Sequence, residues 1–346
     1  MIWLAWRQFR TPAAVLLAAL AALAAVLAIT GPGLADDHAA GLAGCTAQGD
    51  CSAFTRGFFN DHRSAFAGLI AVVVFLPGVI GLFWGAPLVA REVETGTHRL
   101  VWNQSVTRTR WLAVKLTLTG VTAVLVTGLT VLAVSWWSEP IERSAGREFP
   151  RLTPLLFDAR GIVPLAYAAF AFALGVAVGM LVRRTLPAMA ITLAVFAAVQ
   201  LAMPLLVRPH LLPPTEVTAT VTPENVGEFM SEGPGNPIQV KVRPSDEGAW
   251  ILSQRTVDAS GRTVKHVGLT MDSGPCDPHS QPESAERPGP PKRCLDEINE
   301  RGYRQVLTYH PSSRFWPLQW AEAGVYAVLT LGLTGFCFWW IRRRMS

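Results

Sequence analysis

The chain has 346 residues, of which 50% are hydrophobic and only 16% are charged, and its net charge at pH 7 is +5. A soluble domain carries about 25% charged residues. Here the apolar residues occur in long uncharged blocks, so the composition excludes an ordinary soluble enzyme, a disordered protein and a small disulfide scaffold. An integral membrane protein remains.

Six segments are long and apolar enough to cross a bilayer, which requires about 20 residues per helix. None of them contains Asp, Glu, Lys, Arg or His, and lipid leaves the backbone no hydrogen-bond partner outside a helix. The sequence therefore predicts a mainly α, polytopic membrane protein with six transmembrane helices, at Ala13–Ile29, Ser64–Ala90, Leu116–Trp137, Gly161–Val182, Thr185–Val207 and Ala323–Ile341.

The first of these segments also resembles a cleaved signal peptide, because it is rich in alanine and Ala35 follows it. The apolar region of a signal peptide is about 7–15 residues long, however. Retention as a membrane span is favoured, since the other spans alternate consistently only if this one stays.

Orientation follows from Lys and Arg in the short loops. With the N-terminus inside, twelve such residues lie on the cytoplasmic side and six in the short outer loops. The bias predicts a multi-pass protein of the cell membrane with both termini cytoplasmic. It also explains the basic net charge, so no nucleic-acid partner is expected.

The first ten residues predict a short helix lying in the inner headgroup region. Trp3, Trp6 and Arg10 share one helical face, and Arg7 adds positive charge. A simple positively charged start to the first span explains the same residues and stays open.

Four cysteines lie in the predicted outer segments, where the exterior permits disulfides. The expected pairs are Cys45–Cys51 and Cys276–Cys294, although four cysteines allow three connectivities. Four free thiols are the alternative. A metal site is disfavoured because no histidine lies at ligand spacing from either pair.

The long segment 208–322 predicts a β-rich extracellular insertion between helices 5 and 6. Apolar and polar residues alternate with period two around Val217–Thr222 and Ile238–Arg243, a strand pattern. Trp250–Val257 and Thr263–Met271 flank a turn and predict a hairpin, and Asp296–Leu307 suggests a short helix. The domains expected are thus 1–207, 208–322 and 323–346.

The segment 91–115 is the one sizeable cytoplasmic loop. Gly96 predicts a break, and Thr97–Gln104 suits a short helix presented at the membrane base. Such a helix suits docking of a cytoplasmic partner, while a solvated connecting loop explains the same composition.

Catalytic and nucleotide-binding motifs are missing from the sequence. There is no phosphate loop and no metalloprotease motif. No intramembrane carboxylate marks a proton or ion relay. If the protein moves a substrate, another subunit must supply the energy. Two Gly-x-x-x-Gly patterns, Gly81–Gly85 and Gly175–Gly179, are interpreted as helix packing sites.

The stretch from Phe83 to Lys115 resembles the permeases of type-2 ABC exporters, in which an acidic residue, a Gly-Thr and a Ser/Arg stretch follow the second span. The residues of this stretch are similar to those of the actinobacterial branch of the family. The residues of Ser313–Glu322, before the last span, are similar to that branch as well. The layout of six spans, N-terminal helix and outer insertion agrees with this resemblance.

The resemblance implies a permease dimer, a homodimer here, with two cytoplasmic ATPase subunits that bind ATP and Mg; this chain would hold no cofactor. It implies that Trp3–Arg10 form a connecting helix. It also implies that the loop contacts the ATPase through Glu92, Glu94, Gly96, Thr97, His98, Arg99 and Leu100.

The function expected is therefore ATP-driven export by alternating access. The uncharged spans suit an amphiphilic or apolar substrate. A non-transporting sensor, whose outer domain binds an envelope ligand or an antibiotic, is the alternative. An intramembrane enzyme is disfavoured because the spans hold no catalytic set.

Overall fold

A computed structural model describes residues 2–46, 49–96, 107–145, 150–231, 233, 235–272, 274–277 and 290–343, with the side chains of the first helix described from Ala13 onward. The chain divides into two compact units. The membrane unit comprises Met1–Phe149, Thr153–Leu211 and Trp316–Ser346. The inserted domain comprises Pro150–Leu152 and Leu212–Phe315.

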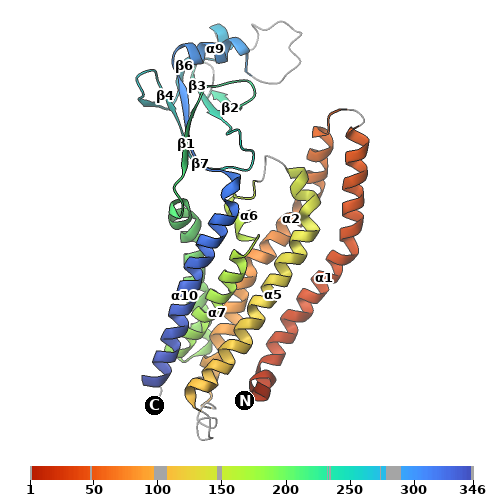
Figure 1. Ribbon diagram of the computed structural model, residues 1–346, viewed down its shortest axis with the longest axis vertical. Helices are drawn as coiled ribbons and strands as arrows, with labels where there is room; N and C mark the ends of the chain where they lie inside the picture. Colours follow the sequence, from red (N-terminus) through yellow and green to blue (C-terminus); the bar gives the residue numbers. More distant parts are fainter. Residues whose placement is uncertain are drawn as a thin grey trace. The chain divides into compact units, whose positions relative to one another are not determined.

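The membrane unit is helical throughout (Figure 1). Among the described residues, six helical stretches are long and apolar enough to cross a membrane, as the sequence predicted. Its elements are α1 (Ile2–Thr46), α2 (Ser52–Ile80), the π-helical turn η1 (Gly81–Gly85), α3 (Ala86–Glu94), α5 (Arg108–Ala145), α6 (Pro154–Asp158), α7 (Val163–Val182), α8 (Thr185–Ala202), the π-helical turn η2 (Met203–Val207), the 3₁₀ turn η3 (Arg208–His210) and α10 (Phe315–Arg343).

The loop expected at Thr30–Arg63 is wrong, because most of this stretch is helical. The apolar helix Ala13–Thr46 has 34 residues, which at 1.5 Å per residue gives about 50 Å, well beyond the roughly 30 Å hydrocarbon core. Helices α1 and α2 thus extend past one membrane face as a hairpin. The predicted Cys45–Cys51 disulfide closes its tip, between the end of α1 and the start of α2.

The N-terminal stretch is helical from Ile2 but is continuous with the first span. A separate interfacial helix is therefore not seen. Trp3, Trp6, Arg7 and Arg10 lie outside the described side chains, and their interfacial role stays a prediction.

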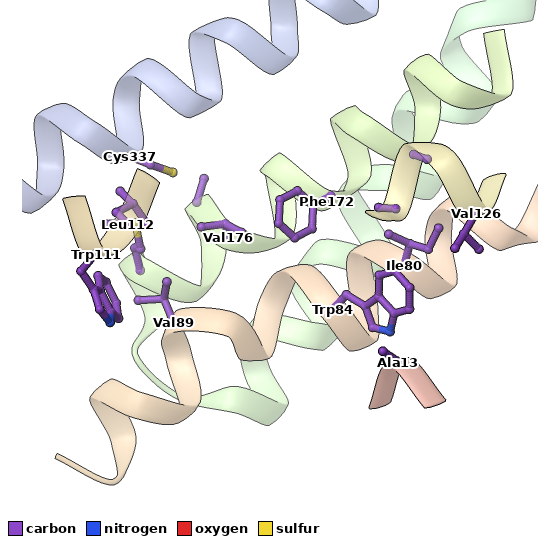
Figure 2. Packing of buried hydrophobic residues seen from close by; sticks show 14 of the residues in the cluster. Ala13, Ile80, Trp84, Val89, Trp111, Leu112, Val126, Phe172, Val176 and Cys337 are labelled. Atoms are coloured by element: carbon purple, nitrogen blue, oxygen red, sulfur yellow. The ribbon is translucent and has the colours of Figure 1, made fainter. Parts of the chain in front are cut away.

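Helix α7 lies at the centre of the membrane unit. Of its apolar span 72% is buried, against 11% for α1 and 17% for α8 and α10. Figure 2 shows Phe172 and Val176 of α7 among buried side chains from α1, α2, η1, α3, α5 and α10. The peripheral helices instead turn large apolar side chains outward, as a protein surrounded by lipid requires.

The two Gly-x-x-x-Gly pairs face each other where η1 and α3 cross α7. A β-carbon on Gly85 would lie 2.6 Å from the carbonyl oxygen of Phe172, and one on Gly179 would lie 2.5 Å from that of Ala86. A β-carbon on Gly81 or Gly175 would meet the backbone of the opposing helix equally closely. Only glycine permits this approach of two backbones.

The inserted domain holds two antiparallel sheets, ordered β1-β7-β4-β5 and β2-β3-β6. Its core includes Ile238, Val240, Val267 and Leu295. Its elements are β1 (Thr215–Ala219), β2 (Val226–Ser231), β3 (Pro237–Val242), β4 (Trp250–Val257), β5 (Thr263–Val264), β6 (Val267–Thr270), the 3₁₀ turn η4 (Gly274–Cys276), α9 (Lys292–Glu300), β7 (Arg304–His310) and the 3₁₀ turn η6 (Ser312–Arg314).

The predicted hairpin is present in part: β4 pairs with β5, with Thr256 opposite Val264, whereas Val267–Thr270 of the predicted second strand form β6 in the other sheet. The helix expected at Asp296–Leu307 is partly wrong. Helix α9 ends at Glu300, Gly302 adopts a positive φ of 80°, and the chain continues as β7 between β1 and β4. Cys276 and Cys294 form the second disulfide and are fully buried.

Replacing Gly175 by Ala should destabilise the membrane unit by about 1–3 kcal/mol, the usual cost of overpacking a filled site. The matched control is Gly68→Ala in α2, where an added methyl group meets nothing within 4 Å. The measurement is the melting temperature of the purified chain in detergent. Equal melting temperatures for the two variants would show that the close approach of α7 to η1 and α3 does not constrain packing.

Candidate functional site

At the loop end of the membrane unit, where α3 leads into segment 97–106, Glu92 of α3 forms an ion pair with Lys115 of α5. Both side chains are buried, with 8% and 5% of their surface exposed. The Lys115 ammonium also donates to the Leu88 carbonyl at 3.4 Å and lies 4.7 Å from the ring centre of Trp111. Two buried charges are tolerated together because each compensates the other.

Two residues further on, Glu94 reaches a different helix. Its Oε2 accepts hydrogen bonds from the Thr185 backbone N–H at 2.9 Å and from the Thr185 hydroxyl at 2.7 Å. A carboxylate in this position caps the positive end of α8. The turn before α8 is tight, since α7 ends at Arg183, whose φ is 58°.

Helix α3 is thus tied to α5 by Glu92 and to α8 by Glu94. Gly96 follows with a φ of 72°, which suits glycine and turns the chain away from α3. Of the residues expected to contact an ATPase, Thr97, His98, Arg99 and Leu100 lie outside the described residues. Glu92 is buried against Lys115 and braces α3, and its contact with an ATPase stays a prediction. Glu94 remains exposed.

At the insertion end, where the chain leaves the membrane unit after η3 and returns through α10, a second set of polar side chains is buried. Arg208 of η3 is fully buried and makes two bonds to Glu322 of α10, from Nε to Oε2 at 2.7 Å and from Nη2 to Oε1 at 3.0 Å. Its Nη2 also pairs with Asp158 of α6. The Tyr167 hydroxyl of α7 lies 2.9 Å from Asp158 Oδ1 and 2.5 Å from Glu322 Oε1. We call these four residues the insertion-end cluster.

Two further contacts close this end of the bundle. The Gln319 side-chain oxygen accepts from the Ile162 and Val163 N–H groups, both at 3.0 Å, and so caps α7 from α10. Arg160 pairs with Glu142 of α5, and its Nη2 donates to Ser138 at 2.5 Å. The Arg208 pairs link η3 to α6 and α10, and the Arg160–Glu142 pair links the turn after α6 to α5.

Sequence reasoning missed the insertion-end cluster. Arg208 directly follows the predicted fifth span, Glu322 directly precedes the sixth, and Asp158 precedes the fourth, so all three were assigned to outer loops. The premise that the spans hold no charge is corrected, because the helices continue past the predicted ends. The charged residues next to the ends of three predicted spans were the signal in the sequence that could have revealed the cluster.

In the part of the chain that the structure describes, no group of three or more His, Cys, Asp or Glu side chains could hold a metal ion. A groove of about 230 Å³ between α1 and α5 is lined by apolar side chains such as Leu20, Leu27 and Val126, with Thr130 as a polar member. The hydroxyl of Thr130 bonds to its own helix, so this surface suits apolar groups.

Residues 17–208 match a family described as ABC-2 membrane transporter related. The chain belongs to this family. It is a membrane component of an ABC system, and the ABC-2 family implies ABC ATPase subunits as partners. No curated protein and no solved structure matches the chain. The matched residues run from Leu17 in α1 to Arg208, and they include both ends of segment 97–106. The strands of the inserted domain and α10 come after the match.

Breaking the Glu92–Lys115 pair on one side should cost about 3–5 kcal/mol, because it leaves an uncompensated buried charge. We expect Glu92→Gln and Lys115→Met each to lower the melting temperature in detergent, and the double variant to lower it by less than the sum. Glu228→Gln is the control, since its exposed pair with Lys241 contributes under about 1 kcal/mol. Additive effects of the two substitutions would contradict the pairing.

Proposed function

We propose that this ABC-2 family member is the permease of an ATP-driven exporter that moves an amphiphilic or apolar substrate by alternating access. Two copies would enclose the path, and two separate ATPase subunits, which bind ATP and Mg, would dock on the cytoplasmic side. Family membership is the observation that carries this proposal. The motif positions around 91–115 fall inside the matched region.

Both termini and segment 97–106 would lie in the cytoplasm. Support comes from the positive charge at Arg183, Arg184, Arg342 and Arg343, which end spans on the side of this segment. The inserted domain would then lie outside, where its disulfide and that of the α1–α2 hairpin are stable.

The bracing of α3 supports a route for coupling. A force on segment 97–106 would reach α5 through Glu92 and Lys115, and α8 through Glu94 and Thr185. Helices α5 and α8 both pack on α7, so one docked subunit would move two spans together. For ATP to drive transport, docking of the ATPase must stabilise one of two states of the helix bundle more than the other.

A non-transporting sensor is the second candidate, and the inserted domain favours it. The domain has its own core and a buried disulfide, which suits binding of an envelope ligand or an antibiotic. Vesicles that contain the permease and a partner ABC ATPase separate the two candidates. Export predicts ATP-dependent movement of a fluorescent amphiphile, whereas ligand-stimulated ATP hydrolysis without movement would favour the sensor.

Replacing Glu94 by Ala should uncouple the complex. Glu94 is exposed, so the loss of its two bonds to Thr185 should leave the chain folded and able to bind its ATPase. Substrate-stimulated ATP hydrolysis should fall towards the basal rate, because α8 no longer follows α3. Asp37→Ala, an exposed carboxylate on the α1–α2 hairpin, is the matched control. Full stimulation in the Glu94 variant would exclude this coupling route.

A further inference from the structure

The insertion-end cluster has one negative charge too many. Its described side chains are two carboxyl groups, one guanidinium group and one phenol, so full ionisation of both acids would leave a net charge of −1. Arg208 and Glu322 are completely buried, and Asp158 is 5% exposed. An uncompensated charge at such a site is costly, and proteins avoid it by neutralising the group.

Hydrogen counting points the same way. A tyrosine hydroxyl has one hydrogen to donate. The Tyr167 oxygen lies within hydrogen-bond distance of both Asp158 Oδ1 and Glu322 Oε1, and Arg208 Nη2 also donates to it at 3.2 Å. A proton on one of the two acids would give each of the two carboxyl contacts of Tyr167 a hydrogen of its own.

The geometry indicates which acid carries it. Glu322 receives two parallel bonds from Arg208, the arrangement of a guanidinium–carboxylate pair. Asp158 is then the surplus group. Burial raises the pKa of Asp158; the Arg208 guanidinium opposes this rise, and the Glu322 carboxylate adds to it.

Other groups around the cluster do not supply the missing positive charge. Arg160 is engaged by Glu142 and Ser138. Tyr326 lies one helical turn after Glu322, its ring centre is 4.7 Å from that of Tyr167, and its fully buried hydroxyl has no hydrogen-bond partner among the described residues. Within the described residues, Arg208 is the cation that bonds to both Asp158 and Glu322.

We propose that the insertion-end cluster is a proton-binding site in which Asp158 is the neutral acid at neutral pH. Asp158 donates its proton to the Tyr167 oxygen, Tyr167 donates to Glu322, and Glu322 is the carboxylate that pairs with Arg208. Deprotonation would leave two buried carboxylates sharing the single Arg208 guanidinium, with a net charge of −1 between α6, α7, η3 and α10. The bound proton therefore stabilises the contacts among these elements.

Infrared spectroscopy of the full chain in detergent tests this site directly. At pH 7 the wild type should show the C=O stretching band of a protonated carboxylic acid, shifted in D₂O. Asp158→Asn should abolish that band and leave the chain folded, because an amide also donates to Tyr167. Glu139→Gln, at an exposed carboxyl group of α5, is the control and should retain the band. Absence of the band in the wild type, or its persistence in Asp158→Asn, would overturn the proposal.

Stability as a function of pH gives a second readout. The folded chain keeps a proton that the unfolded chain releases above about pH 4, so wild-type stability should fall relative to Asp158→Asn as pH rises. The difference should approach tenfold in the unfolding constant per pH unit until Asp158 ionises in the folded state. If the stabilities of the wild type and Asp158→Asn change with pH in the same way, the proton site is overturned. It is also overturned if Na⁺ or K⁺ stabilises the wild type but not Asp158→Asn, because a metal cation would then balance the charge. None of these results depends on whether the chain transports a substrate.

Discussion

A buried charge in a helix bundle must find its partner inside the bundle, because lipid offers none. Lys115 with Glu92, Arg160 with Glu142, and Arg208 with Glu322 all meet this requirement, and each pair joins separate elements of the bundle. Apolar packing against lipid selects no particular neighbour. These pairs, with the close approach of glycines along α7, therefore specify which helices lie together.

The ion pairs lie at the two ends of the membrane unit. Segment 97–106 follows one end, and the chain leaves for the inserted domain at the other. At the loop end, Glu92 and Glu94 tie α3 to α5 and α8 just before segment 97–106, for which we propose a docking role. At the insertion end, Arg208 and Glu322 bond across the points where the chain leaves for the inserted domain and returns from it. A movement of α7 relative to α10 would have to separate the insertion-end cluster. The ends are thus the places where a change of state would be controlled.

Much of the fold was predictable from periodicity and length. Six apolar segments, the β4–β5 hairpin and the spacing of Cys45 and Cys51 carry local signals. The paired charges carry none, since Glu92 and Lys115 are 23 residues apart and Arg208 and Glu322 are 114 apart. Sequence reasoning ended each span at the first charge, as lipid contact demands. Inside a bundle, however, a helix can continue past a charged residue that has a partner. Because the prediction did not allow for this, it placed Lys115, Arg208 and Glu322 in loops. Likewise β7 was partly taken for a helix, because its buried residues gain their partners from β1 and β4.

Sidedness connects the coupling segment to the inserted domain, and the cysteines of the chain make it measurable. Four are in disulfides and Cys337 is fully buried, so a cysteine introduced on the surface is the reactive one. Leu100→Cys would report the loop, and Met230→Cys, at a side chain 55% exposed on β2, would report the inserted domain. A membrane-impermeant maleimide should label Met230→Cys in intact cells and Leu100→Cys only after the membrane is opened. Labelling of Leu100→Cys in intact cells would contradict the cytoplasmic position on which the proposed coupling to ATP hydrolysis depends.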